Sequence, residues 1–265
     1  MLNFLSFGSG SSGNCYYLSN GSYAILIDAG IGIRVLKKAF GEYGLRPDDI
    51  RYIFVTHDHA DHVKSVGKLS SELNVPVYAT AKVHEGIVHN YCVRRKIPAA
   101  NALVMNKGTT LNLDEGLAIT SFHVPHDSND NVGYHIAWGG TTLTLMTDAG
   151  HVTDEMEQFI RGAEHLVIEA NHDELMLMSG NYPAYLKERI SSDIGHLSNR
   201  ACAKALAQNA TERLKRVWLC HLSQENNHPE LARKTIEMAL RQCLPADIAI
   251  EVLKRRSPSG MYNLN

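Results

Sequence analysis

Most residues from position 56 to 62 carry side chains that can bind a metal ion. The segment reads His57-x-His59-x-Asp61-His62 and directly follows an apolar run that is typical of a buried strand. Imidazole nitrogen and carboxylate oxygen are ligands that divalent cations prefer. In an extended segment His57 and His59 face the same side and can share one ion, whereas Asp61 and His62 follow a turn and can bind a second. A solvated loop is the alternative interpretation, but so dense a set of donors favours a metal site.

Further donors stand where other strands are expected to end. His126 follows one apolar run, Asp148 ends the run LTLMT, and His221 ends the run VWLC. Sheet proteins commonly place their sites on the loops that follow strands. A carboxylate such as Asp148 can bridge two cations and hold them close enough to share a hydroxide. The sequence therefore predicts a site for two metal ions.

The order of these motifs resembles the five motifs of the metallo-β-lactamase superfamily. They run from Asp28 in LIDAG through the 57–62 element to His126, Asp148 and His221. The resemblance implies an α/β fold, the four-layer αββα sandwich, with a dinuclear site at one edge. It also implies the ligands: His57, His59 and His126 for one ion, Asp61, His62 and His221 for the other, Asp148 as the bridge, and Asp28 as a supporting residue.

Four longer segments resemble one branch of this superfamily, the YycJ branch, which is linked to 5′→3′ DNA exonuclease activity. They are FGSGSSGNCYYL, VPHDSNDNVGY, GHLSN and HLSQENNHPE. Glu169 and His196 also match, in order, a Glu/His pair of superfamily nucleases in which the histidine lies near the leaving group. A carboxylate on one imidazole nitrogen keeps the other nitrogen ready to donate a proton. Asp61, His196 and Glu169 are therefore the expected catalytic residues, with Asp61 also accepting a proton.

The spacing of the motifs indicates a compact member of the superfamily. Asp148 and Glu169 are too close in sequence for the long arm that tRNA 3′-processing enzymes insert there. Asp148 and His221 are likewise too close for the extra domain of the β-CASP nucleases. We therefore expect a single hydrolase domain over residues 1–265.

The composition is that of an ordinary globular enzyme. A chain of 265 residues with 44% hydrophobic residues can bury a sizeable core, and no apolar run is long enough for a membrane helix. The N-terminus lacks the features of a signal peptide, so a cytoplasmic location without membrane association is expected by default. Five scattered cysteines without a CxxC pair argue against a disulfide framework and a thiolate zinc site. A net charge of -2 indicates no polyanion partner, so the expectation of DNA as substrate rests on the resemblance and the Glu169/His196 pair. Nothing in the sequence indicates a protein partner.

A glycine-rich loop near the N-terminus is a candidate for substrate binding. Gly8, Gly10 and Gly13 form a GxGxxG pattern, but a β-hairpin rather than a helix is expected next, which excludes a dinucleotide-binding unit. Backbone N–H groups of the loop could face a phosphate, and a tight interstrand loop is the equal alternative. The candidate substrate contacts are Ser9, Ser11, Ser12 and Asn14, with His228 as a further candidate that could instead start a helix.

Three short basic runs, at 94–96, 213–216 and 254–256, usually belong to solvated faces. They could hold DNA phosphates only if they converge beside the site.

The expected elements alternate so that helices must cover the faces of a sheet core. Strands are expected over 2–7, 15–19, 23–30, 51–56, 117–124, 132–138, 141–150, 164–170, 216–223 and 246–253, and helices over 33–43, 65–74, 81–91, 197–210 and 228–242.

The expected function is a dinuclear metal-dependent hydrolase, in particular a phosphodiesterase or nuclease that uses a metal-bridging hydroxide. Zinc suits the His/Asp ligands, and manganese is also matched to the carboxylates. One alternative keeps the fold but hydrolyses a small phosphodiester or a thioester, as in the glyoxalase-II-like branch. The Glu169/His196 pair weighs against a thioester, because a thiolate leaving group needs little protonation. A second alternative is a non-hydrolytic protein, such as a diiron redox member or a metal-holding partner.

Overall fold

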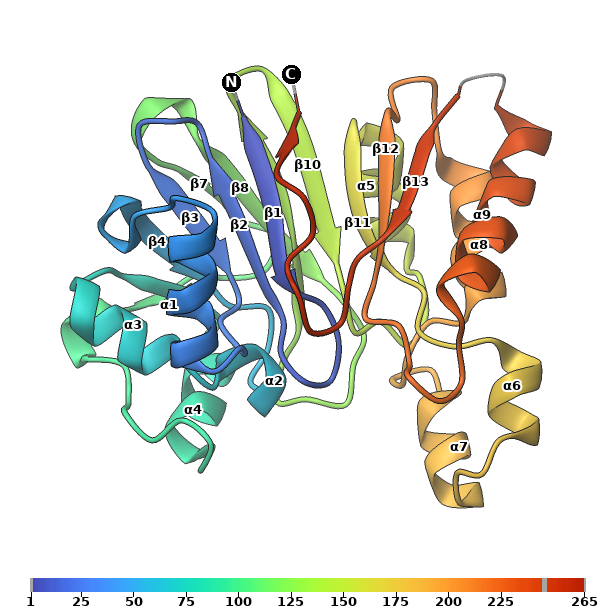
Figure 1. Cartoon of the computed structure of the whole chain (residues 1–265), viewed down its shortest axis with the longest axis horizontal. Helices are drawn as coiled ribbons and strands as arrows, with labels where there is room; N and C mark the ends of the chain where they lie inside the picture. The colour runs from blue at the N-terminus through green and yellow to red at the C-terminus, as the bar shows by residue number, and fades with distance from the viewer. Residues whose placement is uncertain (1, 245–246, 265) are drawn as a thin grey trace. The chain divides into compact units, whose positions relative to one another are not determined.

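The computed structural model describes residues 2–244 and 247–264, which form two compact units. Of the described residues, the first unit comprises 2–109, 128–131 and 254–264, and the second comprises 110–127, 132–244 and 247–253. Each unit contains one sheet with helices packed on it (Figure 1). The single domain expected over the whole chain stays a prediction.

The sheet of the first unit has the strand order β14-β1-β2-β3-β4-β5-β6. Strands β1 to β3 are antiparallel. Strands β3 to β6 are parallel, and each connection between them contains a helix, because parallel neighbours need a crossover connection. Leu36 and Phe40 of the first helix pack against strand residues such as Leu26. The bounds are β1 Asn3–Gly8, β2 Cys15–Ser19, β3 Ala24–Ile27, α1 Ile33–Glu42, β4 Ile50–Phe54, α2 Ala60–Val63, α3 Val66–Leu73, β5 Val77–Ala79, α4 Ala81–His89, β6 Ala102–Val104 and β14 Tyr262–Asn263.

The sheet of the second unit has the strand order β13-β12-β11-β10-β9-β8-β7. Strands β10 to β13 are parallel, and β7 to β10 are antiparallel. Ile160, Leu206 and Ile236, from three different helices, share one core with Leu166 and Leu219 of the strands. The bounds are β7 Thr110–Asn112, β8 Ala118–His123, β9 Val132–Trp138, β10 Thr141–Met146, α5 Asp154–Gly162, β11 His165–Glu169, α6 Glu174–Ser179, α7 Ala184–Ile190, α8 Asn199–Asn209, β12 Arg216–Cys220, α9 Pro229–Cys243 and β13 Ala249–Val252.

The predicted strands and helices are present, with shifts of a few residues at their ends. The last predicted strand starts at residue 246, which lies outside the described residues, and is observed as β13. Helices α2, α5, α6 and α7, the three-residue strands β5, β6 and β7 and the two-residue strand β14 were not predicted. Helix α7 has no buried residue and α6 has one, so neither carries the apolar periodicity that marks a helix in a sequence. Within the described residues, no helix is long and apolar enough to cross a membrane.

Candidate metal centre

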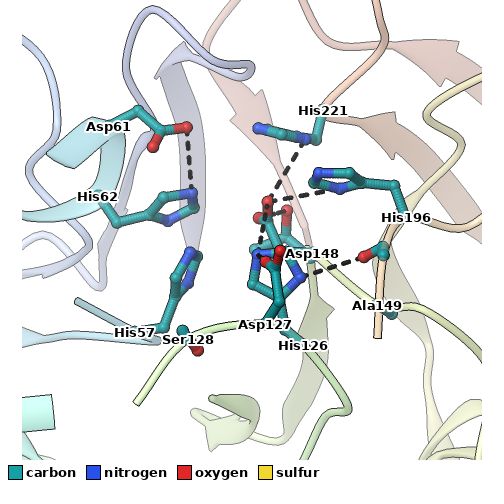
Figure 2. Close-up of polar contacts among 12 residues, drawn as sticks. His57, Asp61, His62, His126, Asp127, Ser128, Asp148, Ala149, His196 and His221 are labelled. Atoms are coloured by element: carbon teal, nitrogen blue, oxygen red, sulfur yellow. Dashed lines mark hydrogen bonds and ion pairs between the residues drawn. The ribbon is translucent and has the colours of Figure 1, made fainter. Parts of the chain in front are cut away.

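Four donors of the first unit lie close together in sequence, two in the loop after β4 and two in helix α2. We call His57, His59, Asp61 and His62 the first donor cluster. The ring centroid of His57 lies 4.7 Å from that of His59 and 4.0 Å from that of His62. Nε2 of His62 lies 3.6 Å from Oδ2 of Asp61 (Figure 2). Two ligands that bind one ion at about 2.1 Å in tetrahedral geometry stand about 3.4 Å apart, so this spacing suits metal donors.

The buried Asp28 carboxylate determines which nitrogen His62 presents. Nδ1 of His62 donates to Oδ2 of Asp28 at 2.7 Å, which leaves the Nε2 lone pair for a ligand. In the structure the Nδ2 group of Asn14 donates to that Nε2 at 2.8 Å. Thr56 donates to Asp28 through both its backbone N–H, at 2.8 Å, and its hydroxyl, at 2.9 Å. Burial raises the pKa of Asp28, and the attraction of His62 offsets that shift in part.

Thr56 also reaches His57, a contact that the sequence analysis did not anticipate. Its hydroxyl already donates to Asp28, so it accepts from Nδ1 of His57, 3.0 Å away. This contact directs the Nδ1 proton of His57 toward Thr56, so Nε2 is the atom of this ring that could bind a metal ion. The sequence signal that could have predicted this contact is the position of Thr56, a hydroxyl residue between an apolar run and the 57–62 motif.

Asp58, in the middle of the motif, has a different role from its neighbours. Its carboxylate accepts hydrogen bonds from the backbone and the side-chain amide of Asn129, at 3.2 and 2.6 Å. Gly86 makes this possible, since a Cβ there would lie 2.1 Å from Oδ2 of Asp58. Asp58 therefore anchors the loop around Asn129 rather than adding to the donors.

The second unit holds another group of donors around one buried carboxylate. We call His126, Asp148, His196 and His221 the second donor cluster, and Figure 2 shows the three rings directed toward Asp148. Oδ1 of Asp148 lies 3.9 Å from Nε2 of His126, 3.7 Å from Nδ1 of His196 and 3.5 Å from Nδ1 of His221. The separation from Nε2 of His126 suits two ligands of one ion, whereas Nδ1 of His196 and of His221 also hydrogen-bond to Glu169, so only their Nε2 atoms could bind a metal ion. The assignment of particular residues to two shared ions stays a prediction.

Glu169, at the end of β11, orients two histidines of the second donor cluster through hydrogen bonds. Its Oε1 accepts from Nδ1 of His196 at 2.8 Å and from Nδ1 of His221 at 3.1 Å. Its Oε2 accepts from the backbone N–H groups of Ala149 at 2.8 Å and Leu197 at 3.1 Å. Burial opposes the charge of Glu169, but the attraction and hydrogen bonds of the two imidazoles outweigh it and lower its pKa to about 2.

His196 is held by Glu169 through one of its two ring nitrogens. Burial disfavours the protonated ring, but the Glu169 carboxylate outweighs this effect and raises the pKa of His196. With Nδ1 bound to Glu169, the Nε2 atom is the one that can serve a substrate. The next helix, α8, starts three residues later at Asn199, where the Ser198 hydroxyl accepts from the N–H of Ala201 and caps it.

A turn around Gly195 supports both His196 and His126. The carbonyl oxygen of Gly195 accepts from Nδ1 of His126 at 3.1 Å, which leaves Nε2 of His126 for a ligand. A Cβ on Gly195 would lie 2.3 Å from the carbonyl oxygens of Arg189 and Ile190, so only glycine fits there. The turn therefore depends on close packing against the end of α7.

Three of the predicted site residues adopt the left-handed backbone conformation. The φ angles are 59° for Asp28, 56° for Asp148 and 52° for His221, and each residue follows a strand by one or two positions. Only two other described residues that are not glycine, Asn74 and Glu115, have a φ in this range. The conformation is uncommon for such residues and here ends each strand with its polar side chain turned out of the strand alternation.

The residues predicted to contact substrate differ in burial: some are buried and some are exposed. The buried Ser9 hydroxyl pairs with the hydroxyl of Tyr16 at 3.0 Å, and Asn14 is buried beside His62 and Asp61. Ser11 and Ser12 are exposed. His228 caps helix α9, with Nδ1 accepting from the N–H of Glu230 at 3.3 Å, as the helix-start alternative has it. Their contacts with substrate stay predictions.

Comparison with known proteins decides the family. The model of the Beta-lactamase superfamily domain matches residues 23–222. The chain belongs to this superfamily. Among its relatives are the exodeoxyribonuclease YycJ of Bacillus anthracis, 35% identical over 91% of this chain and 90% of the relative, and the exodeoxyribonuclease WalJ of Streptococcus pneumoniae, 36% identical over 92% of this chain and 89% of the relative.

Solved structures agree on the fold. The Zn²⁺-bound PqqB of Methylobacterium extorquens superposes with a TM-score of 0.71 at 16% identity and covers 97% of this chain and 99% of its own. The superfamily fold predicted from the sequence is therefore confirmed, as is the resemblance to the YycJ branch. The donor types of both clusters are those that divalent metal ions prefer, and possible ligand atoms of Asp148, Glu169, His196 and His221 lie within 4.8 Å of one another.

Proposed function

We propose that this superfamily member is a metal-dependent nuclease that degrades DNA as a 5′→3′ exonuclease. The similarity to two exodeoxyribonucleases extends over about nine tenths of each chain, so it includes the site rather than the scaffold alone. The polarity of attack is proposed from the resemblance to the YycJ branch. DNA is proposed as substrate on the same ground.

One observation carries the proposal: the ion pair of Glu169 and His196 stands beside the metal donor Asp148. Cleavage of a phosphodiester releases a sugar alkoxide, a strong base that leaves more readily when it receives a proton. His196, held through Nδ1 and charged more readily because of Glu169, can deliver that proton from Nε2. A thioester hydrolase would gain little from this arrangement, because a thiolate is a far weaker base.

We propose zinc as the resident ion, with manganese as the second candidate. Two bound divalent ions supply Lewis acidity, which lowers the pKa of water and offsets charge on the phosphate. The proposed ligands are His57, His59 and His126 for one ion, Asp61, His62 and His221 for the other, and Asp148 for both. Asp28 and Glu169 orient these ligands, and Asp61 is also the proposed proton acceptor.

The experiment is a nuclease assay with oligonucleotides labelled at the 5′ or the 3′ end. Single- and double-stranded DNA and RNA are compared, with chelator-treated protein that is resupplied with zinc or manganese. Asp61→Ala is the blank, because it removes a proposed ligand. Expected is loss of DNA from the 5′ end that requires metal and is absent from the blank.

Other outcomes would redirect the proposal. Degradation of RNA alone would keep the chemistry and change the substrate. No cleavage of any strand by the metal-loaded protein, together with hydrolysis of a thioester or of bis-p-nitrophenyl phosphate, would favour a small-molecule hydrolase of the same fold. Attack from 3′ ends would overturn the proposed polarity.

A further inference from the structure

A groove in the first unit, apart from the donors, is lined by positive charge. It has a volume of about 610 Å³ and is formed by the first turn of α1, the α2–α3 junction and the segment after α4. We call it the basic groove, and its charged and aromatic lining residues are Arg34, Lys64, Lys68, Tyr91, Arg94 and Arg95. None of the described residues that line it is acidic.

Most of these charges have no counter-ion among the residues that the structure describes. Lys68 pairs with Glu72 at 2.7 Å. In the described part of the chain, no ion pair joins Arg34, Lys64, Arg94 or Arg95 to a carboxylate, and all four are exposed. Like charges repel one another when they are gathered in one groove, so the arrangement is relieved by an anionic ligand.

The groove is built by specific packing rather than by chance exposure. Gly67 lets the segment after α4 lie directly on α3, because a Cβ there would be 1.9 Å from the carbonyl oxygen of Arg95. The exposed Lys96 side chain lies back along the end of α4, where its ammonium donates to the carbonyl oxygens of Ile87 and Asn90 at 3.1 and 2.8 Å. This anchor leaves the two preceding arginines on the groove.

Two segments that form the basic groove contact the segment that carries the first donor cluster. Lys64 follows helix α2, which contains Asp61 and His62, and the Ser65 hydroxyl donates to the carbonyl oxygen of Ile31 at 2.6 Å. On the other wall, the Asn90 side chain donates to the backbone oxygen of Asp58 at 2.8 Å. The basic groove is therefore tied through backbone contacts to the loop that holds the donors.

Tyr91 gives the groove a feature that simple anion binding does not need. Its side chain is 90% exposed although the residue is large and aromatic. Proteins that bind single-stranded nucleic acid combine a positively charged groove with aromatic side chains on which bases stack. A base in a duplex is already stacked, so an exposed ring of this kind suits an unpaired strand.

We propose that the basic groove binds single-stranded DNA, with phosphates on Arg34, Lys64, Arg94 and Arg95 and one base stacked on Tyr91. This inference rests on the proposed function and specifies where the substrate strand lies on the first unit. It predicts two separable contributions to binding, one from charge and one from stacking.

The charge contribution is tested with Arg94→Ala/Arg95→Ala. Binding of a fluorescent single-stranded DNA oligonucleotide, its ends protected by phosphorothioates, is measured by anisotropy at several salt concentrations. Loss of two phosphate contacts should reduce the slope of log affinity against log salt by about 1.4 and weaken binding about tenfold. The matched control Lys38→Ala/Lys82→Ala removes the same charge from exposed positions of the first unit that do not line the groove, and should bind like the wild type.

The stacking contribution is tested with Tyr91→Ala and Tyr91→Phe. Tyr91→Ala should weaken binding of the oligonucleotide roughly tenfold but leave binding of an abasic strand of the same length unchanged, and Tyr91→Phe should bind both like the wild type. Equal affinities and salt slopes for all variants would overturn the proposal, as would a wild-type protein that does not bind single-stranded DNA. Metal-dependent degradation of an unprotected, end-labelled DNA oligonucleotide by the wild type, measured alongside, reports separately on the proposed function.

Discussion

Nδ1 of His221 lies 3.1 Å from Oε1 of Glu169, so a buried carboxylate supports a proposed metal ligand. The same oxygen accepts from Nδ1 of His196 at 2.8 Å. One oxygen atom therefore orients two imidazoles, one proposed to bind metal and one proposed to donate a proton. Ligand-supporting carboxylates fix both the tautomer and the orientation of an imidazole. Glu169 therefore connects the proposed metal ligand with the proposed general acid.

Glu169→Gln should weaken both tasks at once. An amide oxygen is a poorer acceptor than a carboxylate, and the amide N–H groups cannot accept from imidazole. We expect zinc affinity to fall about 10- to 100-fold, as is typical when such a support is removed, and turnover to fall with it. Competition against a chromophoric chelator measures the affinity. An affinity equal to that of the wild type would show that His221 does not depend on Glu169.

His196→Ala should separate the two tasks. Turnover on DNA should fall about 100- to 10,000-fold, since a general acid is lost, while metal content stays at the wild-type level. The effect should be much smaller on bis-p-nitrophenyl phosphate, because p-nitrophenolate leaves without a proton. Metal analysis of the purified variant and rates on both substrates make the comparison. Loss of metal, or equal losses on the two substrates, would contradict the leaving-group role.

Asp28→Asn should reduce metal affinity without disturbing the backbone. Asparagine tolerates the φ of 59° found at Asp28, but it no longer fixes the Nδ1 proton of His62 as a carboxylate does. We expect about a 10- to 100-fold loss of zinc affinity with an unchanged far-ultraviolet circular dichroism spectrum. Thr56→Ser is the matched control, because it keeps the hydroxyl that bonds Asp28 and His57 and should bind zinc nearly like the wild type.

Gly195→Ala should destabilise the protein and reduce its activity. The added methyl group would lie 2.3 Å from two carbonyl oxygens at the end of α7, so the turn must move. We expect a loss of about 1–3 kcal/mol in the free energy of unfolding, the range for overpacking, together with slower turnover through His126 and His196. Thermal unfolding and DNA hydrolysis measure the two effects.

Gly162→Ala is the control for that substitution. Gly162 is the last residue of α5, and a Cβ there meets no atom within 4 Å. Alanine in a helix is more favourable than glycine by about 0.5–1 kcal/mol, so this variant should be slightly more stable than the wild type. A destabilised Gly162→Ala would mean that contact distance is not what distinguishes the two glycines.

The sequence predicted the long periodic elements and the donors that cluster in one short segment. The 57–62 motif is visible because its residues are neighbours in the chain, and helices α8 and α9 are visible because each buries one apolar stripe. The fold followed from the resemblance, which the family match confirms.

Contacts between distant parts of the chain could not be predicted in the same way. The link from Glu169 to His221 and the pairing of Asp58 with Asn129 join residues that no spacing rule connects. The basic groove shows the same limit, because its residues come from three segments and only Arg94 and Arg95 form a visible run. Helices α6 and α7 were not predicted, because exposed helices lack the periodic apolar residues that mark a helix in a sequence.

At Asp28, Asp148 and His221, the residue that the proposed chemistry needs is less stable in the left-handed backbone conformation than glycine would be. A residue other than glycine holds this conformation at a cost on the order of 1 kcal/mol, which glycine would avoid and asparagine would reduce. A population of variants selected only for resistance to heat should therefore accumulate glycine and asparagine at these three positions. A population selected for hydrolysis should keep the original residues, so the two selections would mark the strand ends of the site without any knowledge of its ligands.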